Sequence, residues 1–194
     1  MSNLFHQTLS VSRNDKEKLF GHKSFVVWLT GLSGAGKTTI AKLLIEDLHK
    51  KGINTQLLDG DNTRLGINKD LGFSENDRNE NLRRVAELAK LFVDSGAVVI
   101  AAFISPLKNQ RQMVRKIIGK HDFVEVFVDC PLDECEQRDI KGLYKKARAG
   151  EILDFTGINA PYEKPEDADI TISSSLLSIE GCVEQIQKVI SNRF

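Results

Sequence analysis

The chain has 194 residues, a length typical of one domain with a substantial core. Lys plus Arg and Asp plus Glu number 27 each, so no excess charge draws the chain to nucleic acid or a membrane surface, and we expect neither partner. Residues 1–22 lack the apolar core of a signal peptide, and the longest apolar run, residues 97–104, is too short to span a bilayer. The three cysteines form no CxxC pair, which argues against a disulfide framework or a zinc site and favours the reducing cytoplasm.

The first 22 residues are polar and mixed in charge, and they predict a loosely structured arm with a single helical turn at most. Residues 23–194 contain no internal repeat and no low-complexity linker, so we expect one continuous domain there. All the motifs that carry chemistry lie in this second part of the chain.

Residues 31–38 read Gly-Leu-Ser-Gly-Ala-Gly-Lys-Thr and fit the pattern G-x-x-x-x-G-K-[ST]. An apolar, β-favouring run at residues 25–29 precedes this motif, and apolar residues at helical spacing follow it as far as Gly52. Strand, glycine loop and helix is the context of a P-loop, whose backbone N–H groups surround a phosphate chain. A glycine turn before an ordinary helix is the alternative, and it leaves the lysine and the threonine unexplained. The motif therefore predicts that the chain binds a nucleoside triphosphate.

The P-loop pattern also assigns roles to its side chains. Lys37 is expected to reach the β- and γ-phosphates, and the Thr38 hydroxyl is expected to help hold Mg²⁺. The expected nucleotide-binding residues are Gly31, Leu32, Ser33, Gly34, Ala35, Gly36, Lys37, Thr38 and Thr39.

A second predicted strand, residues 55–58, leads directly into two carboxylates, Asp59 and Asp61, with a glycine between them. Ligands in an open α/β sheet gather beyond the carboxyl ends of the strands, so these carboxylates are expected near the phosphate loop. Asp-Gly is also a common turn dipeptide, and a solvated turn is an equally good interpretation of this stretch alone.

A long helix is predicted from Ser74 to Gly96, with Ser74 as its N-cap and an apolar stripe along one face. Arg78 and Asn81 lie three residues apart and share a face near its start. An arginine in the first turn opposes the helix dipole, which suggests that Arg78 serves an anionic ligand. An ion pair between Arg78 and Glu75 or Asp77 explains the residue almost as well.

The uniformly apolar residues 97–104 predict a strand that is covered on both faces of a parallel sheet, and it stops at Ser105. Pro106 suits the first position of a new helix, so Ser105 is predicted to be its N-cap. That structural role stands beside a possible chemical one. The pattern continues with a helix to residue 118, a strand at 123–128 and a short helix after it.

Residues 138–158 lose the apolar periodicity and become basic and glycine-spaced. In a phosphate-binding protein such a stretch favours a mobile lid that brings cations over the triphosphate, although a charged surface loop is the simpler alternative. A fifth strand at 169–172 and an amphipathic helix at 179–190 complete the chain. The order of elements predicts a P-loop NTPase-type, three-layer α/β/α fold with a five-stranded, mostly parallel sheet and a basic lid.

These features together indicate a small-molecule kinase, because phosphoryl transfer needs positioning and charge neutralisation more than covalent help. A GTPase is less favoured since no N-K-x-D guanine signature is present. The residues alone leave the acceptor open.

The acceptor comes from a resemblance. Residues 59–64 (Asp-Gly-Asp-Asn-Thr-Arg), residues 70–74 (Asp-Leu-Gly-Phe-Ser) and the lid stretch 141–150 resemble the adenylylsulfate (APS) kinase family. Residues 103–106 (Phe-Ile-Ser-Pro) and 155–158 (Phe-Thr-Gly-Ile) are similar to it as well. The similarity runs from about residue 22 to the last helix, and these motifs are far more specific than a P-loop alone.

The resemblance implies transfer of the γ-phosphate of ATP, with Mg²⁺, to the 3′-hydroxyl of adenosine 5′-phosphosulfate, the second step of sulfate activation. It also implies a homodimer. The acceptor-binding residues that it implies are Asp59, Arg64, Phe73, Arg78, Asn81, Ile104, Ser105 and Phe155. The implied catalytic residues are Lys37, Asp61, Ser105, Lys145 and Lys146, and the metal site is Thr38 with Asp59.

Within that set, Phe73 and Phe155 are expected to sandwich the APS adenine, and Asp61 is expected to orient or deprotonate the 3′-hydroxyl. Lys145 or Lys146 is expected to neutralise the leaving phosphates. Direct transfer from ATP is favoured over a phosphoserine at Ser105, because a serine nucleophile needs a base and no histidine stands near Ser105 in the sequence.

Two alternatives stay open on the sequence: a P-loop kinase with another small acceptor, and a non-catalytic APS-binding domain. Intact Lys37, Thr38 and Asp61 argue against the second. The chain departs from the family pattern at residues 107–111, where an aromatic residue is common, and at Ile140, where a proline is common.

Overall fold

The computed structural model describes residue 5 and residues 7–194. Its centre is one sheet of five strands in the order β2-β3-β1-β4-β5, and every neighbouring pair is parallel. The strands are β1 Val26–Thr30, β2 Thr55–Asp59, β3 Val98–Ala102, β4 Phe123–Asp129 and β5 Ile170–Ser173. The predicted sheet is confirmed, and it is wholly rather than mostly parallel.

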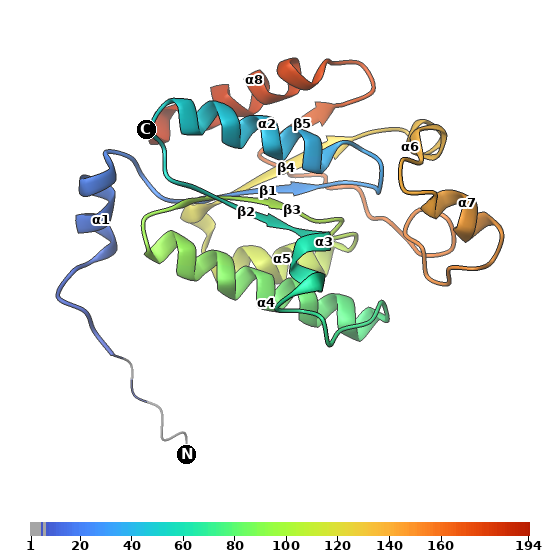
Figure 1. Ribbon diagram of the computed structural model, residues 1–194, viewed down its shortest axis with the longest axis horizontal. Helices are drawn as coiled ribbons and strands as arrows, with labels where there is room; N and C mark the ends of the chain where they lie inside the picture. The colour runs from blue at the N-terminus through green and yellow to red at the C-terminus, as the bar shows by residue number, and fades with distance from the viewer. Residues whose placement is uncertain (1–4, 6) are drawn as a thin grey trace.

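Four long helices cover the two faces of the sheet (Figure 1). Helices α2 (Lys37–Lys50) and α8 (Ile179–Ile190) lie on one face, and α4 (Glu75–Asp94) and α5 (Lys108–Ile118) lie on the other. Alternate residues of β1 enter the two cores, because successive side chains of a strand point to opposite faces. The predicted three-layer α/β/α architecture is therefore confirmed.

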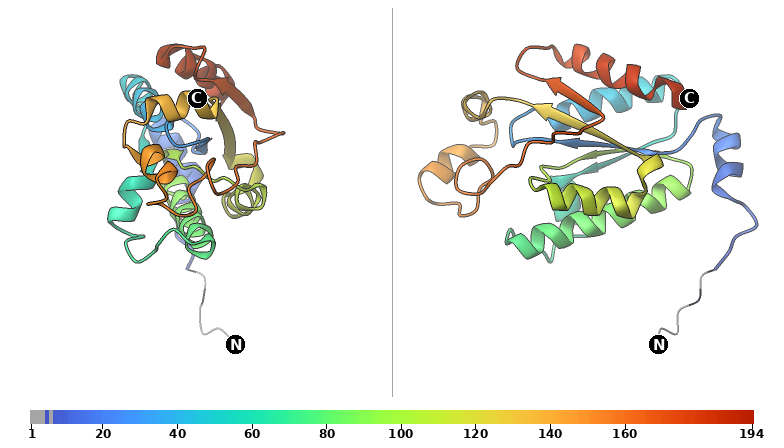
Figure 2. Two further views of the ribbon diagram at one scale, coloured as in Figure 1. Left: turned by 90° about the vertical axis from the view of Figure 1, so that its right-hand side faces the viewer. Right: turned by 180° about the vertical axis from the view of Figure 1, so that it is seen from behind.

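The shorter elements lie at the two ends of the sheet. They are α1 Arg13–Phe20, α3 Gly60–Leu65, α6 Leu132–Arg138, α7 Leu143–Arg148 and the 3₁₀ helices η1 Lys120–Asp122 and η2 Ser191–Arg193. Helices α6 and α7 project beyond the carboxyl ends of the strands, and α1 lies at the opposite end of the molecule (Figure 2). None of the helices in the described part of the chain is long and apolar enough to cross a membrane.

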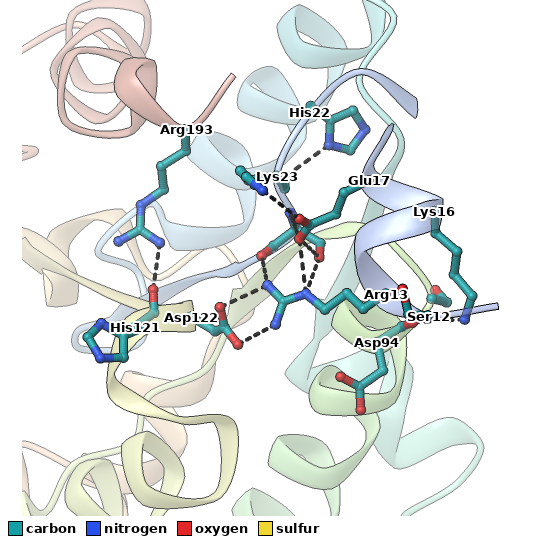
Figure 3. A network of polar contacts seen from close by, with 12 residues as sticks. Ser12, Arg13, Lys16, Glu17, His22, Lys23, Asp94, His121, Asp122 and Arg193 are labelled. Carbon is teal, nitrogen blue, oxygen red and sulfur yellow. Dashed lines mark hydrogen bonds and ion pairs between the residues drawn. The ribbon is translucent and has the colours of Figure 1, made fainter. Parts of the chain in front are cut away.

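The loosely structured arm predicted for residues 1–22 is wrong from residue 12 onward; residues 1–4 and 6 lie outside the described residues. Ser12 and Asp15 form a reciprocal capping box at the start of α1, which runs for two turns. Arg13 reaches from α1 to Asp122, whose Oδ2 is 2.5 Å from Nη1, and Lys16 donates to the carbonyl of Asp94 (Figure 3). The sequence could not reveal this docking, because Arg13 and Asp122 stand 109 residues apart.

Glu17 is the most constrained acidic group of this arm, with its side chain only 9% exposed. Its carboxylate accepts hydrogen bonds from the backbone N–H and the hydroxyl of Ser24 and pairs with Arg13 and Lys23. Burial alone raises the pKa of Glu17, but these hydrogen bonds and positive charges outweigh it and lower the pKa to about 2. The ionised form therefore stabilises the docked arm.

We expect Glu17 to contribute stability that is present above its unfolded pKa of 4.5 and is lost as the pH falls toward about 2. Glu17→Gln should lower the free energy of unfolding at pH 7 by about 2–3 kcal/mol, and urea unfolding measures this difference. The gap between the variant and the parent should shrink below pH 4.5.

Glu80→Gln is the matched control. The pKa of Glu80 is also lowered to about 2, through hydrogen bonds from Arg83 and Arg84, but the Glu80 side chain is 35% exposed, whereas that of Glu17 is 9% exposed. Solvent screens such a pair, so little change in stability is expected. A Glu17→Gln protein with the stability and acid profile of the parent would contradict the docking account.

Candidate active site

The glycine loop between β1 and α2 has the conformation that a phosphate cradle requires. Gly31 has φ +151°, and a Cβ there would lie 2.5 Å from the carbonyl oxygen of Val128. Gly34 and Gly36 also have positive φ, and a Cβ at Gly34 would lie 3.0 Å from the carbonyl oxygen of Cys135. Side chains at these positions would collide or strain the backbone. The glycines thus let the loop curl tightly ahead of α2, as the motif predicts.

Lys37 opens α2 and turns back over the loop. Its Nζ donates to the carbonyl oxygens of Gly31, at 2.9 Å, and of Leu32, at 2.7 Å. Burial lowers the pKa of Lys37 to about 8, while the carboxylates of Asp59 and Asp61 act in the opposite direction. The ammonium group is held by neutral carbonyls at the position where the motif places a phosphate chain.

Asp59 and Thr38 bring two hard oxygen ligands together at the end of β2. Thr38 Oγ1 donates to Asp59 Oδ2 at 2.8 Å, and Asp59 Oδ1 accepts from the backbone N–H of Asp61 at 3.0 Å. Asp59 is buried and caps α3, so this stretch is not the simple solvated turn. The pair suits Mg²⁺, which takes one or two protein oxygens together with substrate phosphates.

Asp61 faces the lid stretch rather than open solvent alone. Its carboxylate forms an ion pair with Lys141, although both side chains remain more than half exposed. The sequence prediction assigned lid cations at Lys145 and Lys146, which are exposed on α7 and form no ion pair within the described residues. Lys141, which forms this ion pair, is not among the site residues predicted from the sequence. The available signal was its place in the Lys141-Gly142 pair that begins the family-like lid motif.

Arg64 of α3 and Phe73, which lies just before α4, contact each other. The guanidinium carbon of Arg64 lies 4.4 Å from the ring centroid of Phe73, and Nη1 donates to the carbonyls of Leu71 and Gly72. The Phe73 side chain is 64% exposed. An aromatic face supported by a cation is thus open for stacking.

Arg78 connects α4 to the lid. It donates to the carbonyl of Phe73 at 2.8 Å, to Thr156 Oγ1 at 2.9 Å and to the carbonyl of Asp154. No ion pair joins it to Glu75 or Asp77 in the described chain, so that alternative is wrong. Asn81, three residues on, is buried and accepts from Asn68.

Phe155 is largely buried and packs edge-on against Tyr144, with ring centroids 4.9 Å apart. Tyr144 in turn donates to the carbonyl of Ser33 in the P-loop, at 2.8 Å. Phe155 thereby ties the lid to the phosphate loop. The two-ring sandwich of Phe73 and Phe155 stays a prediction.

The N-cap role predicted for Ser105 is wrong. Helix α5 begins only at Lys108, whose backbone N–H is satisfied by the carboxylate of Glu163 at 2.5 Å. Ser105 has φ +39° and accepts a hydrogen bond from Trp28 Nε1 at 3.1 Å. The carboxylate of Glu163 thus caps the helix, and the indole N–H of Trp28 donates to the Ser105 hydroxyl. Both partners are far from residues 105–108 in the sequence, so the local pattern could not predict them.

A cavity of about 530 Å³ lies beside the phosphate loop and was not foreseen from the sequence. It lies between Leu32 of the P-loop, the start of α6 and the segment 157–164. Tyr162 lines it and contacts Thr30, with 3.2 Å between the two hydroxyl oxygens. Burial raises the pKa of Tyr162 to about 12. The cavity extends the site from the phosphate loop toward the lid.

The backbone of Ile104 also belongs to this edge of the sheet, since its carbonyl accepts from Thr30 Oγ1 at 2.7 Å. The predicted site residues on the P-loop, after β2, at the start of α4 and after β3 therefore gather at the carboxyl ends of the strands. Of the predicted catalytic residues, Lys145 and Lys146 are the two whose side chains make no polar contact among the described residues.

Comparison with known proteins agrees with this geometry. The family model described as adenylylsulphate kinase matches residues 23–173. The adenylyl-sulfate kinase of Bacteroides thetaiotaomicron is 56% identical over 180 residues, which are 93% of this chain and 90% of that relative. The probable adenylyl-sulfate kinase of Bacillus subtilis is 52% identical over 191 residues, 98% of this chain and 96% of that relative.

Solved structures point the same way. The APS kinase of Mycobacterium tuberculosis, in complex with AMPPNP and APS, superposes with a TM-score of 0.85 at 46% identity. The match covers 88% of this chain and 99% of that one. On the family model, the relatives and this superposition together, the chain belongs to the adenylylsulfate kinase family.

Proposed function

We propose that this chain transfers the γ-phosphoryl group of ATP to the 3′-hydroxyl of adenosine 5′-phosphosulfate, giving ADP and 3′-phosphoadenylyl sulfate. The observation that carries the proposal is the meeting of two half-sites at one edge of the sheet. Lys37, Thr38 and Asp59 form the phosphate and metal side, and the Asp61–Lys141 pair connects it to the acceptor side.

The division of labour follows from these contacts. Lys37 holds the β- and γ-phosphates, Thr38 and Asp59 hold Mg²⁺, and Asp61 accepts the proton of the 3′-hydroxyl. When bound, Mg²⁺ would neutralise part of the negative charge of the triphosphate. Residues 138–158 close over the substrates as a lid, in which Lys145 and Lys146 add positive charge beside the leaving phosphates.

Transfer goes directly from ATP to the acceptor rather than through Ser105. The Ser105 oxygen is buried and accepts from Trp28, and no histidine or carboxylate hydrogen-bonds to it among the described residues. A serine nucleophile needs an adjacent base. A chiral γ-phosphate should therefore arrive with inverted configuration.

The test of the reaction is ADP release by the purified protein with Mg-ATP and one acceptor at a time: APS, AMP, shikimate or gluconate. ADP should appear in step with 3′-phosphoadenylyl sulfate, and 3′-deoxy-APS should not be phosphorylated. Faster turnover of AMP or a sugar acid than of APS would assign the chain to another acceptor. APS binding without any ADP release would indicate the non-catalytic alternative.

Phe73→Ala is expected to weaken APS binding by on the order of 1–3 kcal/mol, the scale of base stacking on an aromatic side chain. ATP affinity without APS should not change, and isothermal titration with each nucleotide measures both. Phe155→Ala should also weaken APS binding, but it removes buried packing against Tyr144 and so costs stability as well.

Leu91→Ala is the control, because Leu91 is a similarly exposed apolar residue on α4. Its APS affinity should equal that of the parent. Equal losses for ATP and APS in Phe73→Ala, or no loss for either, would remove the stacking model.

The chain acts in a reducing compartment, the cytoplasm, as a homodimer. Cys130, Cys135 and Cys182 are all buried and free, which supports a compartment without disulfide formation. The dimer follows from the family resemblance. Light scattering after size exclusion should give twice the chain mass of 21.7 kDa.

A further inference from the structure

Asn68 lies in the loop between α3 and α4 and is completely buried. Its backbone is held on both sides: its N–H donates to the carbonyl of Thr63 at 2.9 Å, and its carbonyl accepts from Leu71 at 3.1 Å. Its side-chain Nδ2 donates to Asn81 Oδ1 at 3.0 Å. The rigid loop therefore directs one amide group of Asn68 onto the start of α4.

This contact determines what Asn81 can offer to a ligand. An asparagine amide has an acceptor oxygen and a donor NH₂ group on opposite sides. Because Oδ1 is turned toward Asn68, the Nδ2 group of Asn81 is turned away from it, and Nδ2 makes no hydrogen bond within the described residues. Asn81 therefore faces its ligand as a donor.

The side-chain oxygen of Asn68 lowers the stability of the fold. Its Oδ1 is buried and has no hydrogen-bond partner among the described residues. A buried carbonyl without a donor is unfavourable, and an apolar side chain of similar shape would avoid that cost. Packing alone thus does not account for an amide at this position, whereas a directional hydrogen bond to Asn81 does.

We propose that Asn68 is a positioning residue for the acceptor substrate: it orients the Asn81 amide so that its NH₂ group meets an oxygen of APS. The proposal rests on the proposed function, in which Asn81 contacts APS. Arg64 and Arg78, the neighbouring cations, are also donors only. By orienting Asn81, Asn68 thus adds a third hydrogen-bond donor to those of the two arginines. The phosphosulfate oxygens carry no proton, so they can only accept hydrogen bonds.

Asn68→Leu removes the donor without adding charge and with little change in shape. We expect the Kd and KM for APS to rise about tenfold, the effect of one well-placed hydrogen bond. The kcat at saturating APS and the KM for ATP should stay unchanged, because Asn68 acts only on acceptor binding. Steady-state kinetics and isothermal titration measure these quantities.

A double-mutant cycle separates positioning from a general structural role. In an Asn81→Ala background the group that Asn68 orients is gone, so adding Asn68→Leu should weaken APS binding no further. A loosened loop would instead produce additive losses. Gln110→Leu is the matched control: Gln110 of α5 is also buried and donates an amide hydrogen to Asn79 of α4, the helix that carries Asn81, at 2.7 Å. It should leave APS affinity unchanged.

Asn68→Asp keeps the shape and serves if the leucine variant does not fold. A carboxylate can only accept, so Asn81 must turn its NH₂ inward, and APS binding should weaken at least as much as in Asn68→Leu. Unchanged APS affinity in either variant, or additive losses in the cycle, would overturn the assignment. If the parent protein turns over APS while the Asn68 variants give one of these results, the positioning role is wrong but the proposed function stands.

Discussion

Replacing Lys37 by alanine is expected to lower kcat by at least roughly 10²–10³-fold, the scale of losing one preorganised electrostatic contact. The Lys37 ammonium is buried and held by the carbonyls of Gly31 and Leu32, so its position over the loop exists before nucleotide arrives. A charge that is already in place costs no reorganisation when negative charge builds on the bridging oxygen. The measurement is ADP release at saturating ATP and APS.

The same residue predicts a pH dependence. Since burial lowers the pKa of Lys37 to about 8, its positive form is progressively lost as the pH rises through that value. We expect kcat/KM for ATP, which reports groups of the free enzyme, to fall above about pH 8. Lys37→Arg should abolish this decrease in kcat/KM at high pH, because arginine stays charged.

Lys50→Ala is the control at the far end of the same helix, where the lysine is exposed and pairs with Asp47. Its kcat should match that of the parent. Near-parental turnover in a folded Lys37→Ala protein would show that the P-loop is not the catalytic phosphate site.

Asp61→Asn is expected to lower kcat by about 10²–10⁴-fold, the range for loss of a general base. The substitution keeps the shape of the side chain and removes its capacity to take the proton of the 3′-hydroxyl. Asp61 suits this role because its backbone N–H is anchored on Asp59 while its carboxylate stays accessible and lies against Lys141. The loss should appear in kcat more than in the KM for APS.

Glu136→Gln tests whether any carboxylate–cation pair near the lid has the same effect. Glu136 pairs with Arg148 on α7 much as Asp61 pairs with Lys141. That variant should keep parental kcat. If Asp61→Asn instead raises the KM for APS and leaves kcat unchanged, Asp61 binds the acceptor but does not act as a base.

Features with a local origin could be predicted from the sequence. The helix expected at 179–190 is observed as α8 Ile179–Ile190, since a helix buries one stripe every few residues and the pattern records it. Ser74 caps α4 as its spacing to Asp77 indicates. The P-loop is equally local, because its shape depends on glycines within one short segment.

The parallel sheet also follows from the alternation of apolar strands and helices, and with it the edge at which the site lies. That edge brings Asp59 to Thr38 although the two residues are 21 positions apart. The family motifs then identified the acceptor, which neither periodicity nor composition could do.

What only the tertiary structure decided are the partners of individual side chains. Ser105 looks like a cap until Trp28, 77 residues away, occupies its oxygen and Glu163 caps α5 instead. Asp61 meets Lys141 across 80 residues, and Arg13 docks on Asp122 across 109. Each of these contacts depends on how separate elements pack, and a polar side chain in the sequence carries no record of the donor or acceptor that packing will place beside it.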